Sequence, residues 1–243
     1  MALPILETAT YELTLPSADI KVKYRPFLVK EEKVLLQALE SNDDVEIKNA
    51  IKDIVSTCTF GQLDAGKLPT FDLEFVFLQI RSKSVGEVAN IRLLCPDDKE
   101  TYVTKEVDLS KVEVQVDDEH TNEIKISDTI KMIMKYPTID TVDPKLNVKG
   151  MKTQQVFDMI TGCIHSIIDG EKEHFVKDYT KDELNKFIES LDRKSFDKLN
   201  KFFDTMPQLR HEIEVENPKT KVKSKIVLKG AQDFFVLPSL TTA

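Results

Sequence analysis

Residues 93–103 read LLCPDDKETYV, and this stretch indicates how the middle of the chain folds. An apolar, strand-like run ends at Cys95, a short polar turn with a proline follows, and a second strand-like run resumes at Thr101. This pattern is typical of a β-hairpin. It also looks like half of a zinc knuckle, because zinc ribbons place a Cys-x-x-Cys ligand pair on such a turn.

A second stretch, residues 212–230 (EIEVENPKTKVKSKIVLKG), repeats the same order of an apolar strand, a proline-containing turn with lysine, and a second strand carrying lysine. Asn217 stands where the first stretch has Cys95. A zinc site needs about four thiolate or imidazole donors, and neither turn offers a second cysteine. His120 and His211 lie at other strand ends. We therefore expect two ordinary hairpins, with no metal ion and no other cofactor.

Composition excludes several classes of protein. The chain has 243 residues, with 34 Lys plus Arg against 42 Asp plus Glu and a net charge of −8, which repels the phosphate backbone of nucleic acids. No apolar run approaches the roughly 20 residues needed to span a bilayer, and the first ten residues, MALPILETAT, lack the pattern of a secretory signal. The three cysteines, Cys58, Cys95 and Cys163, are odd in number and far apart. We therefore expect a cytosolic protein with reduced thiols that binds neither nucleic acid nor membrane.

The first part of the chain mixes strand-like and helix-like patterns. Period-two alternation predicts a hairpin at 10–27 and a small antiparallel meander at 88–95, 101–109 and 112–116. Apolar residues at three- and four-residue spacings predict helices at 30–40, 43–58 and 127–136. The segment 71–84 is nearly apolar all round, and acidic Asp72 near its start with basic Lys83 near its end favours a central helix.

The second part is predicted to be mainly helical. Residues 136–150 mix proline, aspartate and glycine without periodicity, so we expect a boundary there between an N-terminal α+β domain at 1–145 and a C-terminal helical domain at 146–243. Three helices are expected. The first spans 153–169, the second begins at a capping box formed by Thr180 and Glu183, and the third spans 195–207. A hairpin at 211–230 follows them. The fold class is therefore α+β, with a terminal hairpin closing the helical part.

Signatures of enzymes are missing from the sequence. Only seven glycines occur, and none belongs to a phosphate-binding loop. Cys163 and His165 are two residues apart on the expected helix, so they point to different faces and do not form a nucleophile and base. We therefore expect no enzymatic activity. Two alternatives stay open. One is a hydrolase in which Cys163 or a serine meets His165, His174 or His211 in space, and the other is a nucleic-acid protein that uses the alternating lysines of 219–225.

Several stretches together resemble a known family: KYRPFLVKEEKVLL at 23–36, FDLEFVFLQIRSKSVGE at 71–87, the Cys-Pro hairpin, MPQLRHEIEV at 206–215 and LKGAQDFF at 228–235. The chain resembles the baseplate hub and hub-assembly proteins of T4-like contractile-tailed phages. In some relatives the Cys-Pro turn continues to a second cysteine, whereas this chain has Asp97 and Asp98. The resemblance implies a non-enzymatic structural or assembly role with other hub or tail proteins as partners, in the host cytoplasm during assembly or in the tail baseplate. A soluble adaptor unrelated to phage tails is the remaining alternative.

Two aromatic pairs are the candidate partner-binding residues. Adjacent residues on a helix or strand face different ways, so one member of each pair is expected in the core and the other on the surface. The predicted partner-binding set is Phe202, Phe203, Phe234, Phe235 and Leu237.

Overall fold

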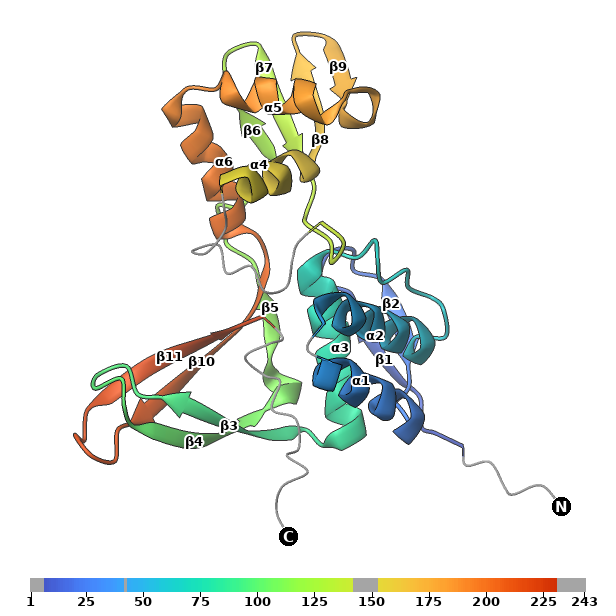
Figure 1. Ribbon diagram of the computed structural model, residues 1–243, viewed down its shortest axis with the longest axis vertical. Coiled ribbons are helices and arrows are strands. Elements are labelled where there is room, and N and C mark those ends of the chain that lie inside the picture. Colours follow the sequence, from blue (N-terminus) through green and yellow to red (C-terminus); the bar gives the residue numbers. More distant parts are fainter. Residues whose placement is uncertain (1–6, 42, 142–152, 231–243) are drawn as a thin grey trace, which may run out of the picture. The chain divides into compact units, whose positions relative to one another are not determined.

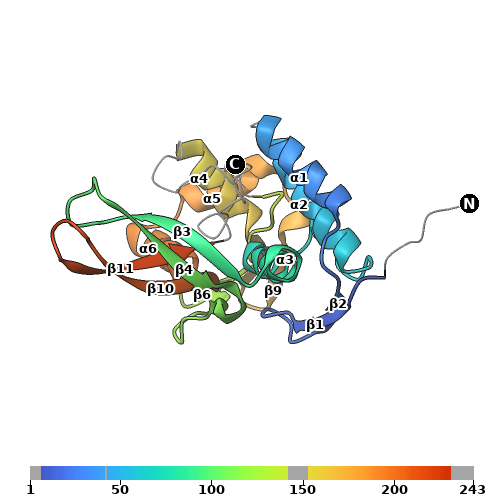
Figure 2. The same cartoon turned by 90° about the horizontal axis from the view of Figure 1, so that it is seen from below.

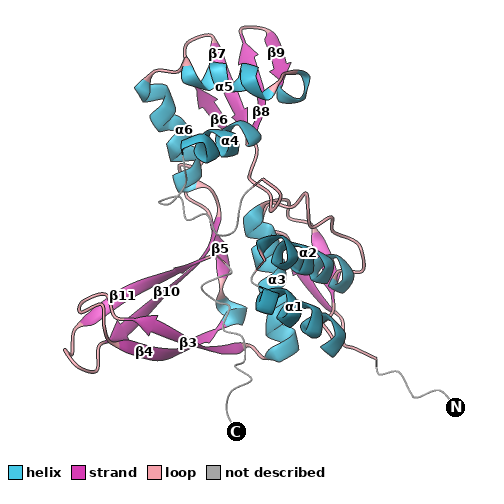
Figure 3. Ribbon diagram, viewed as in Figure 1, coloured by secondary structure: helices cyan, strands magenta, loops and turns pink. Residues whose placement is uncertain are grey.

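The computed structural model describes residues 7–41, 43–141 and 153–230. The chain divides into two compact units, Met1–Gln115 with Gln208–Ala243, and Val116–Pro207. This division differs from the expected boundary after residue 145, which falls inside the second unit. Gln115 and Gln208 are paired in one sheet, so the second unit is an insertion between two neighbouring strands of the first. The α+β fold class is confirmed (Figure 3).

The first unit begins with a hairpin and three helices. Strands β1 (Tyr11–Thr14) and β2 (Lys21–Tyr24) pair antiparallel, and helices α1 (Val29–Ser41) and α2 (Asp44–Cys58) pack against each other. Helix α3 (Thr70–Val85) contacts α2 on one side and the strands of the second half of this unit on another (Figure 1). Burial on several sides explains why its sequence is apolar all round. The helix ends at Gly86, whose φ of 133° is open to glycine but strained for other residues.

The rest of the first unit is a small sandwich of two sheets. Strands β3 (Val88–Leu94) and β4 (Tyr102–Asp108) form one hairpin, and the other sheet has the order β11-β10-β5. The bounds of that second sheet are Glu113–Gln115 for β5, Gln208–Glu216 for β10 and Lys223–Lys229 for β11. The two hairpins run side by side in both views (Figures 1 and 2). The expected hairpins are therefore confirmed, and all three strands of the expected meander are present. The meander itself was wrong, because β5 pairs with β10 of the other sheet and not with β4.

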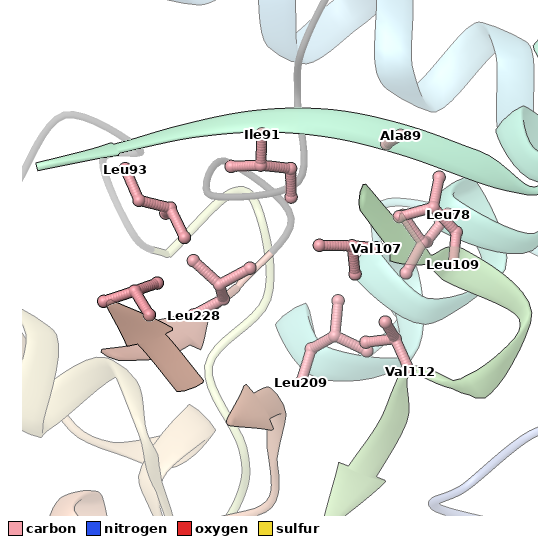
Figure 4. Packing of buried hydrophobic residues seen from close by; sticks show 10 residues of the cluster. Leu78, Ala89, Ile91, Leu93, Val107, Leu109, Val112, Leu209 and Leu228 are labelled. Atoms are coloured by element: carbon pink, nitrogen blue, oxygen red, sulfur yellow. The ribbon is translucent and has the colours of Figure 1, made fainter. Parts of the chain in front are cut away.

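The sandwich core comes from alternate residues of each strand. Ala89, Ile91 and Leu93 of β3 are buried, whereas the residues between them are exposed. Figure 4 shows these side chains facing Leu209 of β10 and Leu228 of β11. Because side chains alternate across a strand, one face of the β3–β4 hairpin builds the core and the opposite face is left to solvent.

The second unit is a four-stranded sheet with helices packed on it. The sheet order is β6-β7-β8-β9, all antiparallel, with bounds Glu123–Lys125, Ile130–Met134, Ile164–Asp169 and Lys172–Phe175. The helices are α4 (Thr153–Gly162), α5 (Lys181–Glu189) and α6 (Arg193–Thr205). Their core combines strand residues such as Met132 with helix residues such as Ile160 and Leu199. The predicted capping box at Thr180 and Glu183 is present.

Two helix predictions in this unit were wrong. The predicted helix at 127–136 is strand β7, which pairs with β6 and β8. The predicted helix at 153–169 ends at Gly162, and the chain continues as strand β8. Both segments are short runs rich in isoleucine, where the periodicity does not separate a buried strand from a helix. Pairing of β7 with β8 decided the outcome, because each strand satisfies the other's backbone groups.

Candidate functional site

The two phenylalanines of α6 differ in how deeply they are buried. Phe202 is 2% exposed, and its ring lies 5.2 Å from that of His120 and 5.9 Å from that of Tyr136. Phe203 is half-buried and meets Phe202 edge to face at 5.1 Å. Phe202 is therefore a core residue, and Phe203 is the member of the pair that stays a candidate for partner binding. The predicted residues Phe234, Phe235 and Leu237 lie outside the described residues.

A second candidate surface is the solvent-facing side of the β3–β4 hairpin, which we call the outer face. Its exposed apolar residues are Val88 (58% exposed), Leu94 (41%) and Tyr102 (51%). Leu94 and Tyr102 are cross-strand partners at the end of the hairpin near its turn. The guanidinium carbon of Arg92 lies 4.3 Å from the centre of the Tyr102 ring, in cation–π contact.

Two residue types of the outer face, tyrosine and arginine, recur in protein-binding surfaces. Tyrosine and arginine are enriched among the residues that dominate interface energetics, because they combine apolar area with hydrogen-bonding groups. The sequence did carry a signal for this surface. Leu93 and Leu94 are adjacent in a strand, so one of them had to face away from the core. The paired phenylalanines at 202–203 and 234–235 give no indication of this surface.

The turns of the two hairpins are joined by side chains, which we call the hairpin clasp: Asp97, Asn217 and Thr220. The Asn217 amide nitrogen donates to both carboxylate oxygens of Asp97, at 3.1 and 3.0 Å. The Thr220 hydroxyl donates to Asp97 Oδ2 at 2.5 Å. Hydrogen bonds from Thr220 and Asn217 lower the pKa of Asp97, so the carboxylate is charged at neutral pH.

Each turn is also closed by its own hydrogen bonds. Asp98 Oδ1 accepts from the backbone N–H groups of Glu100 and Thr101, and its Oδ2 accepts from the Thr101 hydroxyl at 2.5 Å. These bonds, with those of Thr101 the strongest, lower the pKa of Asp98. In the second turn Asn217 Oδ1 accepts from the N–H of Lys219 at 2.8 Å. Cys95, at the start of the first turn, is buried, and burial raises the pKa of its thiol.

Other groups that the sequence suggested for catalysis, Cys163, His165 and His174, lie in the second unit. Cys163 is buried in the core of the second unit, and burial raises the pKa of its thiol to about 12. His165 is exposed and packs edge-on against Phe175, whereas His174 bonds the Tyr179 hydroxyl. Cysteine nucleophiles react as thiolates, so a buried thiol with a raised pKa is poorly suited to that role.

The carboxylates of residues 169–173 lie at the surface of the second unit. Asp169 and Glu171 are exposed to solvent. Glu173 accepts a hydrogen bond from the buried Ser166 hydroxyl at 2.6 Å. Over residues 7–41, 43–141 and 153–230, no three His, Cys, Asp or Glu residues are grouped to hold a metal ion. The same ranges contain no helix with the length and apolar character of a membrane span.

Comparison with known proteins assigns the chain to a family. A family model described as T4 bacteriophage base plate protein matches residues 8–236. No curated protein and no solved structure matched the chain. The match spans the described elements from β1 to β11, including the inserted unit. The chain therefore belongs to the T4 bacteriophage base plate protein family.

Proposed function

We propose that this protein is a non-enzymatic component or assembly factor of the central hub of a contractile phage baseplate. The family match over residues 8–236 carries the proposal, since it places the chain among baseplate proteins. The specific place in the hub rests on the resemblance of residues 23–36, 71–87 and 206–215 to hub and hub-assembly proteins. The burial of Cys58, Cys95 and Cys163 supports a role in binding over one in thiol catalysis.

The outer face is the first surface that we propose for a baseplate partner. Tyr102 and Leu94 present apolar area next to the charged Arg92, and the hairpin beneath them is packed on a core. A surface built on a strand changes little on binding, so less free energy goes into ordering it. Phe203 in the second unit is the other proposed contact.

The row of lysines on the last hairpin does not favour a nucleic-acid role. Lys223 and Lys225 of β11 stand opposite Glu216 and Glu214 of β10 in the antiparallel register. The Lys225 ammonium also lies 2.6 Å from a carboxylate oxygen of Glu212. The glutamates offset the positive charge that would attract phosphates, and lysines on an edge strand discourage unwanted strand pairing. A protein partner is therefore favoured over nucleic acid.

Affinity purification of the tagged protein from phage-infected cells tests the proposal. We expect other baseplate proteins to co-purify with the wild type and to be recovered much less with Tyr102→Ala. Tyr179→Ala is the matched control, because Tyr179 is also an exposed tyrosine (40%) but lies in the second unit. Equal recovery with both variants would move the binding surface away from the outer face, and absence of baseplate proteins from every sample would contradict the hub role.

Mass spectrometry of purified virions distinguishes a component of the hub from a factor that acts only during its assembly. A component is retained in the tail in fixed ratio to its neighbours, whereas an assembly factor is found with baseplate intermediates and is depleted from the finished particle.

A further inference from the structure

The two hairpin turns have the same backbone geometry. Each begins with a residue followed by proline, and the carbonyl of that first residue accepts a hydrogen bond from the N–H of the fifth. The bond from Lys99 to Cys95 is 3.0 Å, and that from Lys221 to Asn217 is 2.9 Å. Both lysines have positive φ, 56° and 63°. Such φ values are uncommon for residues other than glycine, so their recurrence at the same position identifies one turn type used twice.

This pair of turns resembles the ligand frame of a zinc ribbon. In a ribbon, two Cys-x-x-Cys turns from two hairpins face each other and bind one tetrahedral zinc ion with four thiolates. The corresponding first and fourth positions in this chain are Cys95, Asp98, Asn217 and Thr220. The clasp bonds bring the two turns together, as the ligands of a shared ion would.

The donor chemistry at these four positions does not fit zinc. Only Cys95 is a thiol, and its pKa is raised by burial and then by Asp97 and Asp98. Both Asp98 oxygens accept hydrogen bonds inside their own turn, and so does Asn217 Oδ1. The Asn217 amide nitrogen is a donor and has no free pair for a metal. Asp97, which lies between the two ligand positions of the first turn, makes the cross-connection instead.

We propose that this chain has two metal-knuckle turns in which the hydrogen-bonded clasp of Asp97, Asn217 and Thr220 takes the place of the metal ion. The clasp supplies what the ion would supply, a fixed distance between two hairpin tips that are 120 residues apart in the sequence. Asn217 is 1% exposed, so its side chain is withdrawn from water and depends on protein partners. A charged acceptor strengthens these bonds, since Asp97 is ionised.

Removal of the clasp is the first test. Asp97→Ala should speed amide hydrogen exchange at Lys99 and Lys221 by at least about tenfold, because the buried Asn217 amide loses its acceptor. Glu106→Ala is the control, as it removes one negative charge from the same hairpin at an exposed position of β4. Wild-type exchange should not respond to a strong zinc chelator. Unchanged tip exchange in Asp97→Ala, or loss of wild-type protection on chelation, would overturn the proposal.

Restoration of a metal site is the second test, and it does not depend on the first. The triple variant Asp98→Cys, Asn217→Cys, Thr220→Cys should bind one cobalt(II) ion per chain, with the visible absorption of tetrahedral thiolate coordination and Cys95 as the fourth ligand. Adding Cys95→Ser should alter that spectrum. If the triple variant unfolds without metal, refolding with zinc should recover tip protection. Failure to bind cobalt in tetrahedral form, or failure to recover protection with zinc, would show that the turns are not knuckles.

Discussion

Adjacent leucines on β3 should respond differently to the same truncation. Leu93 is 7% exposed and lies in the sandwich core, whereas Leu94 is 41% exposed on the outer face. Leu93→Ala removes three buried carbon groups at about 0.8 kcal/mol each. With the cavity left behind, the free energy of unfolding should fall by about 2.5 to 4 kcal/mol. Leu94→Ala leaves no enclosed cavity, and the loss should be about 1 kcal/mol.

The assay must report on the sandwich itself, because a chain with two compact units need not unfold in a single transition. The chain has no tryptophan, so fluorescence gives no convenient signal. Native-state hydrogen exchange of β3, β4 and β10 amides measures the local free energy of opening, and urea unfolding followed by circular dichroism gives the total. Exchange in β7 and β8 of the second unit serves as an internal control.

Partner binding should show the reverse order. Leu94→Ala should reduce co-purification with baseplate proteins, whereas Leu93→Ala should bind normally at temperatures where it remains folded. Equal losses of stability in the two variants would refute the assignment of inward and outward faces on β3. A larger loss for Leu94→Ala would place the strand in the opposite orientation.

Three further outcomes follow from the packing. In unfolding measurements, Phe202→Ala should lower stability by about 3 to 5 kcal/mol, because Phe202 is fully enclosed, and Phe203→Ala clearly less; equal losses would make Phe203 a core residue. Burial raises the pKa of Cys58 to about 11 and that of Cys163 to about 12, so native alkylation at pH 8 should be slow. Fast labelling of the native protein would contradict this prediction. Because the folded state holds the two thiol protons more tightly than the unfolded state, the protonated thiols contribute to the free energy of unfolding. That contribution is complete below the ordinary thiol pKa of 9.0 and is lost as the pH rises through the pKa values of the folded state. Replacing residues 116–207 by Asn-Gly should leave a folded first unit, since Gln115 and Gln208 are paired and a two-residue loop joins such positions; loss of exchange protection in β3 and β10 would show that the insertion is needed.

Local patterns were sufficient for the elements with strong signals. The capping box at Thr180 places the start of α5, and the helix expected at 195–207 corresponds to α6. The hairpins were recognisable from alternation and proline-containing turns. Segments 130–134 and 164–169 failed because their isoleucine runs are equally compatible with a buried helix and a buried strand. Gly162, at the end of α4, was the available sign that the helix stops.

Long-range organisation was not readable in the same way. A change in composition near residue 145 suggested a boundary along the chain, but the first unit is closed by a strand pair between residues 113–115 and 208–210. Composition along the chain carries no record of which distant segments pair. The clasp is also a long-range contact that composition does not reveal, because Asp97 and Asn217 are 120 residues apart in the sequence. The repeated turn sequence was visible, whereas the contact between the two turns required the fold.

The clasp fixes the turn of the β3–β4 hairpin, and the outer face is formed by side chains of the same hairpin. A two-stranded ribbon such as β3–β4 is marginally stable by itself. Its inner face is held by Ile91 and Leu93 against the β10–β11 hairpin, and its turn is held by Asp97. Tyr102 and Leu94 lie close to that turn in the register. Under the proposed function, a partner therefore meets side chains whose backbone is already fixed, and less of its binding free energy goes into ordering them. Asp97 and Asn217 then influence binding through the order of the hairpin and need no contact with the partner.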